Sequence, residues 1–297
     1  MSLFDKEALA GKRILITGGG TGLGKGVADF LVAHGAEVHL WGRRGAVVEE
    51  AANEINQRHG QHVHFQSVDI RSAEQIDVAM SEIWSKYGPL TGVLNNAAAN
   101  FIAPTKDLSP RGFEAITSTV MNGAFFTTQA AGKRWIAEKL TGSVVSMLVS
   151  WVWTGSAFVV PSAMAKAAVD VMTKSLAVEW GGYGIRLNAV APGPFPTDYA
   201  WEMLSPTPES AVGATQSDEV PFGHRFGQMH ELANALIFLF SDGCDYLTGQ
   251  TIAIDGAHHL AAPSTFVGLT KLSDDDWKTI RERSQAATAV SKAERSV

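Results

Sequence analysis

Apolar segments of two kinds alternate along most of the chain. Short apolar or alternating runs predict strands at residues 14–16, 37–41, 62–68, 92–95, 143–149, 185–190 and 251–254. Apolar residues at helical spacing predict helices after the first strand and at 46–58, 73–87, 113–139, 162–180 and 231–240. Strands and helices that alternate in this way indicate an α/β fold, a doubly wound parallel sheet with helices on both faces. Ligands of such sheets bind beyond the carboxyl ends of the strands.

Three segments interrupt this alternation. The long helix 113–139 is expected to break near Asn122-Gly123. Residues 192–228 are rich in proline, serine and threonine, which predicts a loop. Beyond residue 257 the pattern is less regular, with one further helix over 274–283 that Ser273 caps.

The first strand runs directly into a glycine-rich turn. After Ile14-Leu15-Ile16 and Thr17, glycines stand at positions 18, 19, 20, 22 and 24, and a helix follows. Glycine permits positive φ and lets an anion approach the main chain, and the first N–H groups of the helix then face that anion. Strand, glycine-rich turn and helix together predict a dinucleotide-phosphate site rather than an ordinary tight turn.

The end of the second predicted strand bears on the choice of nicotinamide cofactor. A site for the ribose diol of NAD has a carboxylate about 20 residues after the glycines, but this strand ends in Trp41-Gly42-Arg43-Arg44. Guanidinium groups bind a 2′-phosphate bidentately, so we predict NADP(H), with Arg43 as the main contact and Arg44 beside it. The alternative is a solvated pair of arginines at the start of a helix. Asp69, after the third strand, either accepts from the adenine amino group or caps the next helix.

Composition excludes several other kinds of protein. Of the 297 residues 45% are hydrophobic, and the net charge of −6 comes without a basic cluster, so we expect no nucleic-acid partner. A single cysteine, Cys244, excludes an internal disulfide and is typical of a reducing compartment. The nine histidines show no metal-ligand spacing, so no metal site is predicted, and His258-His259 is interpreted as a surface pair. We find neither a membrane-spanning run nor a targeting segment, and expect a cytoplasmic protein.

A set of motifs along residues 10–257 resembles the short-chain dehydrogenase/reductase family. The set comprises Thr17-Gly18-x-x-x-Gly22-x-Gly24, Asn95-Asn96-Ala97-Ala98, Asn122, Lys166 and Pro192-Gly193-Pro194 with Thr197. Within that family, residues 95–110, 155–188 and 269–280 are similar to the 2,4-dienoyl-CoA reductases, tetrameric NADPH enzymes that reduce a conjugated dienoyl thioester to a 3-enoyl-CoA. The resemblance implies one Rossmann-type domain over residues 1–260 and a C-terminal extension over 261–297 that supports substrate or subunit contacts.

The resemblance also implies residue roles at a cofactor site. Lys166 would hold the hydroxyls of the nicotinamide ribose, and Asn122 would keep the central helix kinked and bind a water near Lys166. The full cofactor set that it implies is Gly18, Gly20, Thr21, Gly22, Leu23, Gly24, Arg43, Arg44, Asp69, Ile70, Asn96, Ala97, Lys166, Pro192, Gly193, Pro194, Phe195 and Thr197.

A substrate site and an assembly follow from the same resemblance. It implies acyl-CoA contacts at Arg71, Phe101 and Ser109, with Asn100 donating to the thioester carbonyl. From the residues alone, an Asn and a Phe directly after a strand-end turn would lie at a pocket mouth, although Asn100 is also typical of an ordinary turn. The helix around 165–177 implies a homotetramer, because its counterpart in the family packs against a neighbouring subunit.

The sequence departs from the family at the usual acid. Ser162 stands where the family has a tyrosine four residues before the lysine, and a serine hydroxyl is too weak an acid to replace a phenol. Ketone reduction by the common tyrosine–lysine route is therefore disfavoured. The positions that hold proton donors or substrate-loop groups in the resembled reductases are Trp151, Val149, Val120 and Met203.

Reduction of a conjugated thioester depends less on such an acid. Hydride addition places negative charge on the thioester oxygen, which fixed hydrogen-bond donors can stabilise. Asn100 and the indole N–H of Trp151 can both donate, and water ordered by Lys166 or Ser162 would then protonate carbon. Alternatively, Trp151 is apolar filler in the acyl pocket.

Three functions therefore remain open. The favoured one is an NADPH-dependent reductase of an unsaturated acyl-CoA. The second is a carbonyl reductase or alcohol dehydrogenase, for which Tyr199 is the only phenol nearby. The third is a catalytically impaired NADP(H)-binding protein, which the lost proton donors favour and the retained Lys166 and Asn122 oppose.

Overall fold

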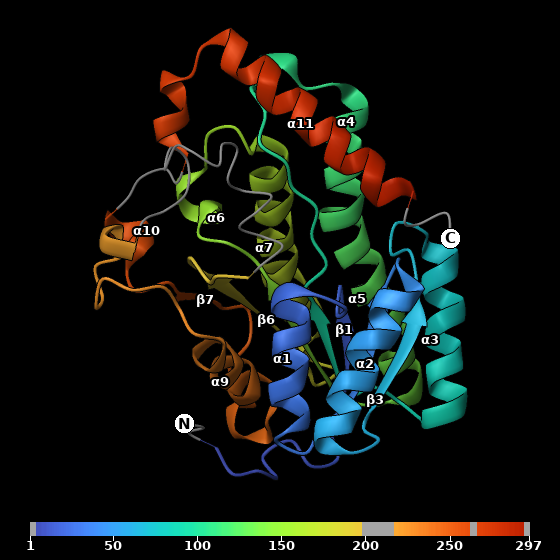
Figure 1. The fold of residues 1–297 in the computed structure, drawn as a ribbon. Coiled ribbons are helices and arrows are strands. Elements are labelled where there is room, and N and C mark those ends of the chain that lie inside the picture. The colour runs from blue at the N-terminus through green and yellow to red at the C-terminus, as the bar shows by residue number, and fades with distance from the viewer. Residues whose placement is uncertain (1–3, 198–216, 262–265, 294–297) are drawn as a thin grey trace.

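The described residues form one sheet of seven parallel strands, in the order β3-β2-β1-β4-β5-β6-β7 (Figure 1). This computed structural model describes residues 4–197, 217–261 and 266–293. The strands are β1 (Arg13–Thr17), β2 (Glu37–Gly42), β3 (Val63–Ser67), β4 (Gly92–Asn95), β5 (Gly142–Met147), β6 (Ile185–Pro192) and β7 (Thr251–Ile254). The chain order reverses between β1 and β4, so a crevice for ligands is expected where these two strands end.

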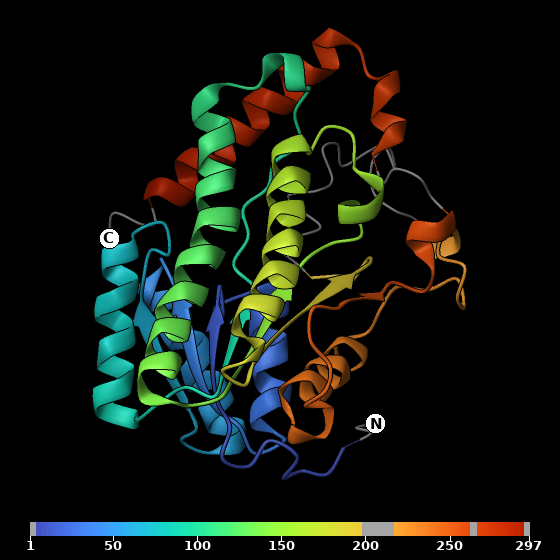
Figure 2. The same cartoon turned by 180° about the vertical axis from the view of Figure 1, so that it is seen from behind.

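Helices cover both faces of the sheet, as the sequence predicts. One face carries α1 (Gly22–Val32), α2 (Gly45–His59) and α9 (Met229–Phe240) (Figure 1). The opposite face carries α3 (Ala73–Tyr87), α5 (Gly123–Glu138) and α7 (Val160–Gly181), which stand side by side in Figure 2. The predicted doubly wound parallel sheet is confirmed. Among the described residues, no helix has both the length and the apolar character that a membrane crossing demands.

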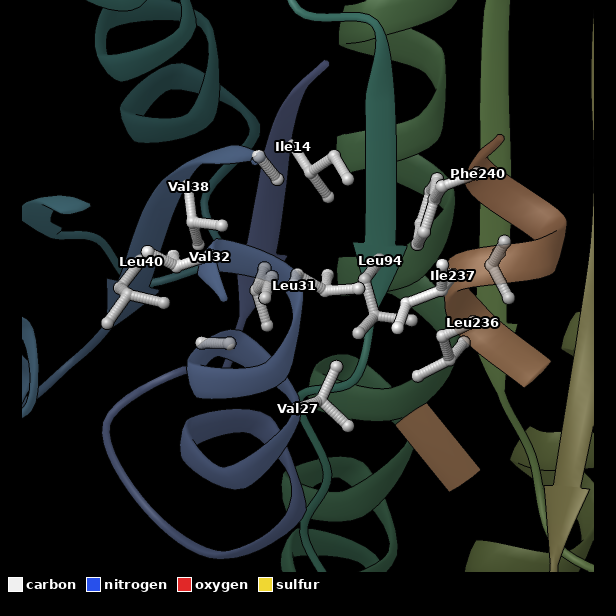
Figure 3. Close-up of a cluster of buried hydrophobic side chains, with 14 of the residues drawn as sticks. Ile14, Val27, Leu31, Val32, Val38, Leu40, Leu94, Leu236, Ile237 and Phe240 are labelled. Carbon is white, nitrogen blue, oxygen red and sulfur yellow. The ribbon is translucent and has the colours of Figure 1, made fainter. Parts of the chain in front are cut away.

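The largest part of the core lies between the sheet and α1, α2 and α9. Figure 3 shows Ile14, Val38 and Leu40 of the sheet facing Val27 and Leu31 of α1, and all five side chains are fully buried. The alternate strand residues face the other helical layer, so the inner strands of the sheet are buried on both sides, whereas the edge strands β3 and β7 are more exposed. Burial on both sides is why these strands read as nearly continuous apolar runs in the sequence.

The predicted break in the long helix is a π-helical turn. α4 (Pro110–Thr117) leads into the π turn Ser118–Asn122, and α5 begins at Gly123. Gly123 lies against Ile70, whose Cδ1 would be only 2.5 Å from a Cβ at this position. The single extra residue of a π turn lets the helix continue past this close approach, and such turns are frequent at functional sites.

The C-terminal segment packs over the carboxyl ends of the strands. α11 (Asp274–Ala293) extends beyond the predicted residue 283 and crosses α4 in Figures 1 and 2. Two ion pairs attach it to the loop before α4, Lys106 with Asp274 at 2.7 Å and Arg281 with Asp107 at 3.1 Å. An apolar cluster beneath it consists of Ile102, Val159, Phe266, Leu269, Trp277 and Ile280.

The segment after β7 places His258 and His259 differently from the prediction. The interpretation of His258-His259 as a surface pair is wrong, because His258 is 3% exposed and Nδ1 of His259 lies 2.6 Å from Asp255 Oδ2. Positive φ angles at Gly256 and Ala257 turn the chain inward just before α10 (His258–Ala261). Tyr199 and Met203 lie outside the described residues.

Candidate active site

The glycine-rich turn is bound to the end of β4 by polar contacts across the switch point. Nδ2 of Asn96 donates to the carbonyl oxygens of Thr17 at 3.0 Å and Gly18 at 3.1 Å. In return, Oγ1 of Thr17 accepts from the backbone N–H groups of Asn96 and Ala97, each at 3.1 Å. Two of the predicted cofactor residues, Asn96 and Ala97, therefore also fix the shape of the turn.

Glycine is required at several positions of this turn. A Cβ on Gly24 would lie 2.4 Å from the carbonyl oxygen of Gly18, and Gly18 and Gly22 have φ angles of +66° and +55°. Thr21, the N-cap of α1, makes no side-chain capping bond, and the first turn of α1 contains no acidic residue. The N–H groups at this helix end are thus left for an anion.

A hollow of about 490 Å³ opens beside the turn. Its walls come from the turn, α1 and the end of α2, and from the segment after β6. Its lining residues are Gly20, Thr21, Gly22, Lys25, Gly26, Asp29, Arg58, Pro196 and Thr197. Thr197 lies against the turn, with Oγ1 3.7 Å from the place of a Cβ on Gly22.

Residues 193–195, which lie between β6 and the hollow, are tightly packed. Gly193 donates from its backbone to the carbonyl of Ile254 at 3.0 Å, and a Cβ on it would lie 2.6 Å from that of Asp255. Pro194 accepts from Gly227 N at 3.0 Å, and Phe195 is 8% exposed. Pro192 belongs to β6 itself, which is longer than predicted.

The two arginines predicted to select the cofactor lie at the end of β2. Arg43 is exposed, and its carbonyl accepts from Ser67 Oγ at 3.2 Å, whereas Arg44 is the N-cap residue of α2. A charged, solvent-accessible guanidinium at this strand end is what a 2′-phosphate site needs.

Asp69 and Arg71, predicted to contact different ligands, form an ion pair with each other. Arg71 Nε donates to both carboxylate oxygens of Asp69 at 2.9 Å, and this hydrogen bonding lowers the pKa of Asp69. The alternative role of Asp69 as a helix cap is wrong, because Ser72 caps α3 by accepting from Gln75 N. Ile70 between them is buried against Gly123.

Lys166 is buried on α7 at the carboxyl end of β5. It is 7% exposed, and its Nζ donates to the carbonyl oxygen of Met147. Burial lowers the pKa of the Lys166 ammonium to about 8. Ser162, 4% exposed, precedes it by one helical turn and shares its face of α7.

Asn100 brings an unsatisfied polar atom into this region. Its Oδ1 is buried and has no hydrogen-bond partner. Buried side-chain oxygens are nearly always paired, so such an atom indicates a site that a ligand or water completes. Phe101, the residue after Asn100, packs against a small apolar cluster of Ile116, Val120 and Ala165. This contact holds the loop against α4, the π turn and α7.

The remaining predicted site residues have structural contacts of their own. Ser109 is the N-cap of α4 and accepts from Gly112 N at 3.1 Å. Asn122 is the last residue of the π turn and is half-buried. Trp151 begins α6 (Trp151–Thr154), and its ring lies 5.7 Å from that of Phe266 in the C-terminal segment.

Sequence reasoning missed two sets of contacts at this end of the sheet. Nδ2 of Asn95 donates to Thr128 Oγ1 at 2.8 Å, which connects β4 to α5. The pairing of Asp69 with Arg71 was also missed, although two opposite charges two residues apart after a strand are a signal for it.

Comparison with known proteins places this geometry in a family. The family described as enoyl-(acyl carrier protein) reductase matches residues 18–259. A "probable 2,4-dienoyl-CoA reductase [(2E)-enoyl-CoA-producing]" of Bacillus subtilis is 40% identical over 250 residues, which are 84% of this chain and 97% of that protein. A "probable 2,4-dienoyl-CoA reductase 3 [(3E)-enoyl-CoA-producing]" of Caenorhabditis elegans is 40% identical over 84% of this chain and 81% of its own length.

Solved structures agree with this assignment. A short-chain dehydrogenase from Bacillus anthracis is 38% identical with a TM-score of 0.76, covering 86% of this chain and 98% of its own. A gluconate 5-dehydrogenase from Burkholderia cenocepacia, in complex with NADP and tartrate, is 29% identical with a TM-score of 0.80, covering 87% and 99%. The chain is therefore an oxidoreductase of the short-chain dehydrogenase/reductase family, similar within it to the 2,4-dienoyl-CoA reductases.

Proposed function

We propose that this protein reduces a conjugated dienoyl- or enoyl-CoA thioester with NADPH. One observation carries the choice against a ketone substrate: a buried Ser162 stands where ketone reduction needs a phenol. Among the described residues, Tyr183 and Tyr246 are exposed, and Tyr87 packs on two histidines of β2 and β3. None of these phenols lies on α7 beside Lys166.

The glycine-rich turn fits the pyrophosphate of a dinucleotide. Gly18, Gly19 and Gly24 leave no room for a Cβ, and the side chain of Thr21 does not cap the N–H groups at the start of α1. Arg43 would bind the 2′-phosphate, and Lys166 would hold the nicotinamide ribose. When bound, NADPH supplies the hydride. The gluconate 5-dehydrogenase neighbour, which holds NADP, supports the same cofactor here.

Asn100 would polarise the thioester carbonyl. An amide N–H fixed at the pocket mouth stabilises negative charge on that oxygen without being an acid. The Oδ1 of Asn100 is buried without a partner, so it would accept from a water or a ligand hydroxyl while Nδ2 donates to the thioester oxygen. Trp151 would line the acyl pocket beside Phe266, with its indole N–H as a second donor.

Lys166 and Ser162 would order the water that protonates carbon. Both are buried on one face of α7, and a pKa of about 8 keeps Lys166 mostly charged at neutral pH. Its positive charge therefore adds to the field that stabilises an enolate.

A side-by-side assay tests this proposal. NADPH oxidation is measured with a dienoyl-CoA, an enoyl-CoA and a ketoacyl-CoA. We expect turnover of a conjugated thioester, loss of about 10²-fold in kcat for Asn100→Ala, and no change for Asn53→Ala, an exposed asparagine of α2. Turnover of the ketoacyl-CoA alone would assign the protein to the carbonyl reductases. Nucleotide binding without any turnover would indicate an impaired enzyme.

The position of the remaining double bond needs its own measurement. The two curated relatives carry names with different products, a (2E)-enoyl-CoA and a (3E)-enoyl-CoA. We propose the 3-enoyl product, and proton NMR of the reduced thioester distinguishes the two. Trp151→Phe tests the indole, because full activity in this variant would exclude it as a donor.

We also propose that the protein is a homotetramer that packs through α5 and α7. Met164, Val171 and Val178 recur every seven residues along α7 and are 54%, 61% and 86% exposed. Phe125 is 40% exposed on α5, the helix that stands beside α7 in Figure 2. Light scattering of the wild type should give about four times the chain mass of 31.7 kDa, and Val171→Asp should reduce it.

A further inference from the structure

A second cluster of chemically active side chains lies at the opposite end of the sheet from the cofactor site. Glu37 begins β2, His39 follows on the same face of that strand, and His64 lies on β3. His39 and His64 are directly paired in the register of the two strands. Strands alternate their side chains with a period of two, so all three side chains point to the α3 face of the sheet.

The distances between these side chains suit a metal ion. Oε1 of Glu37 lies 3.4 Å from Nε2 of His39 and 3.3 Å from Nε2 of His64. Two ligands that each bind zinc at about 2.0–2.1 Å with tetrahedral angles are about 3.3 Å apart. One ligand atom from each residue lies within 4.8 Å of the other two.

The imidazole of His39 is buried with one nitrogen unpaired. It is 2% exposed, and its Nε2 is a buried atom without a hydrogen-bond partner. A buried imidazole nitrogen is normally paired, and here it is directed at the one carboxylate that a second imidazole also approaches. Glu37 and His64 are about a quarter exposed, so an ion can reach the cluster from solvent.

From this geometry we propose that Glu37, His39 and His64 bind a divalent first-row transition-metal ion, best suited to Zn²⁺. Two imidazoles and one carboxylate are a common zinc ligand set, with a water in the fourth position. Burial lowers the pKa of both histidines, which favours the neutral imidazole that a metal requires.

The neighbours of the cluster fit an outer shell around a metal site. Arg13 donates from Nε to Oε1 of Glu37 at 2.9 Å and from Nη2 to Oε2 at 2.8 Å, and ligating carboxylates are commonly held by such hydrogen bonds. The ring of Tyr87, at the end of α3, packs on both imidazoles with centroids 4.9 and 4.1 Å away. The charges of Arg13 and of Lys86, which lies over Tyr87, reduce affinity for a cation, and the oxygen that faces the histidines, Oε1 of Glu37, also accepts from Arg13 Nε.

A bound ion would connect β2, β3 and the end of α3. The proposed role is thus structural, since the cofactor turn follows the other ends of these strands. Because a metal that binds only the native state stabilises it, Zn²⁺ should raise the thermal midpoint.

The test uses the whole protein after treatment with a chelator and desalting. Zn²⁺ is titrated by calorimetry, and Co²⁺ is added separately to look for the visible absorption of tetrahedral cobalt. We expect one strong Zn²⁺ site per chain, lost by at least about tenfold in affinity in His64→Ala. The matched control is His59→Ala, because His59 meets the carboxylate of Asp29 at 2.9 Å and belongs to no group of three potential ligands within the described part of the chain. It should bind Zn²⁺ like the wild type.

His39→Gln provides a second variant, with circular dichroism to establish that it is folded. Loss of the Zn²⁺-dependent rise in thermal midpoint in both His64→Ala and a folded His39→Gln supports the site. Equal Zn²⁺ affinity in the wild type and His64→Ala would overturn it, as would a wild type that binds no Zn²⁺.

Discussion

Removal of the Lys166 charge should make the nucleotide-free protein more stable while it abolishes catalysis. Lys166 is buried, it has one hydrogen bond, to the carbonyl of Met147, and burial lowers its pKa from 10.5 to about 8. In Lys166→Met a side chain of similar length fills the same space without a charge. This variant therefore tests whether a charge that catalysis requires lowers the stability of the folded protein.

The magnitude follows from the pKa. A difference of about 2.5 pKa units corresponds to about 3 kcal/mol of unfavourable burial at pH 7. Lys166→Met also loses the hydrogen bond to the carbonyl of Met147, which costs about 1 kcal/mol. The expected net gain in the free energy of unfolding is therefore about 2 kcal/mol.

The gain should also depend on pH. The native lysine binds its proton more weakly than the unfolded one, so the penalty is complete below pH 8 and disappears as pH rises from 8 towards 10.5. Between pH 7 and pH 9.5 the advantage of Lys166→Met should shrink by about 2 kcal/mol.

Urea unfolding followed by tryptophan fluorescence, at fixed protein concentration and without nucleotide, measures these differences. Lys133→Met is the matched control, because Lys133 is exposed on α5, and it should change stability by no more than about 0.5 kcal/mol. If Lys166→Met were less stable than the wild type at pH 7, or if its advantage did not depend on pH, the reasoning from burial would be refuted.

Four further predictions concern the site and the segments that support it. The value of kcat/KM with a conjugated thioester should fall as pH rises past about 8, where Lys166 loses its proton, and a flat profile from pH 7 to 10 would contradict that role. Gly24→Ala should weaken NADPH binding and destabilise the protein by more than about 1 kcal/mol in calorimetry, because its Cβ would meet Gly18 O at 2.4 Å, whereas Gly181→Ala, with open space around it, should be neutral or stabilising. Trp277→Ala should cost about 3 kcal/mol and increase hydrogen exchange in α11, unlike Trp153→Ala at a 43% exposed position. Arg43→Ala should raise the KM for NADPH at least about tenfold and leave that for NADH unchanged, and equal effects on both would contradict a 2′-phosphate contact.

Local patterns were sufficient to predict much of this fold. Helix 73–87 and strands 92–95 and 251–254 have the bounds that apolar periodicity indicates. The break near Asn122-Gly123 was also predicted, because polar and small residues interrupt an otherwise apolar helix. These features depend on residues close together in the chain.

Other features depend on partners far apart in sequence. Nothing near His39 indicates His64, because the register of two parallel strands brings them together. His258 looks like a surface residue until the turn at Gly256 and Ala257 buries it. α11 extends past its predicted end as a polar helix, for which apolar periodicity gives little signal.

The attachment of α11 has a consequence for how this protein can diversify. The family match ends at residue 259, before the segment whose Phe266 contacts Trp151 and whose Trp277 is buried beside it. This appendage is joined to the body by a small apolar cluster and two exposed ion pairs, so it can vary without disturbing any strand of the sheet. Exchange of the segment that carries Phe266 and Trp277 would thus remodel the wall beside Trp151 and leave the sheet and the glycine-rich turn unchanged.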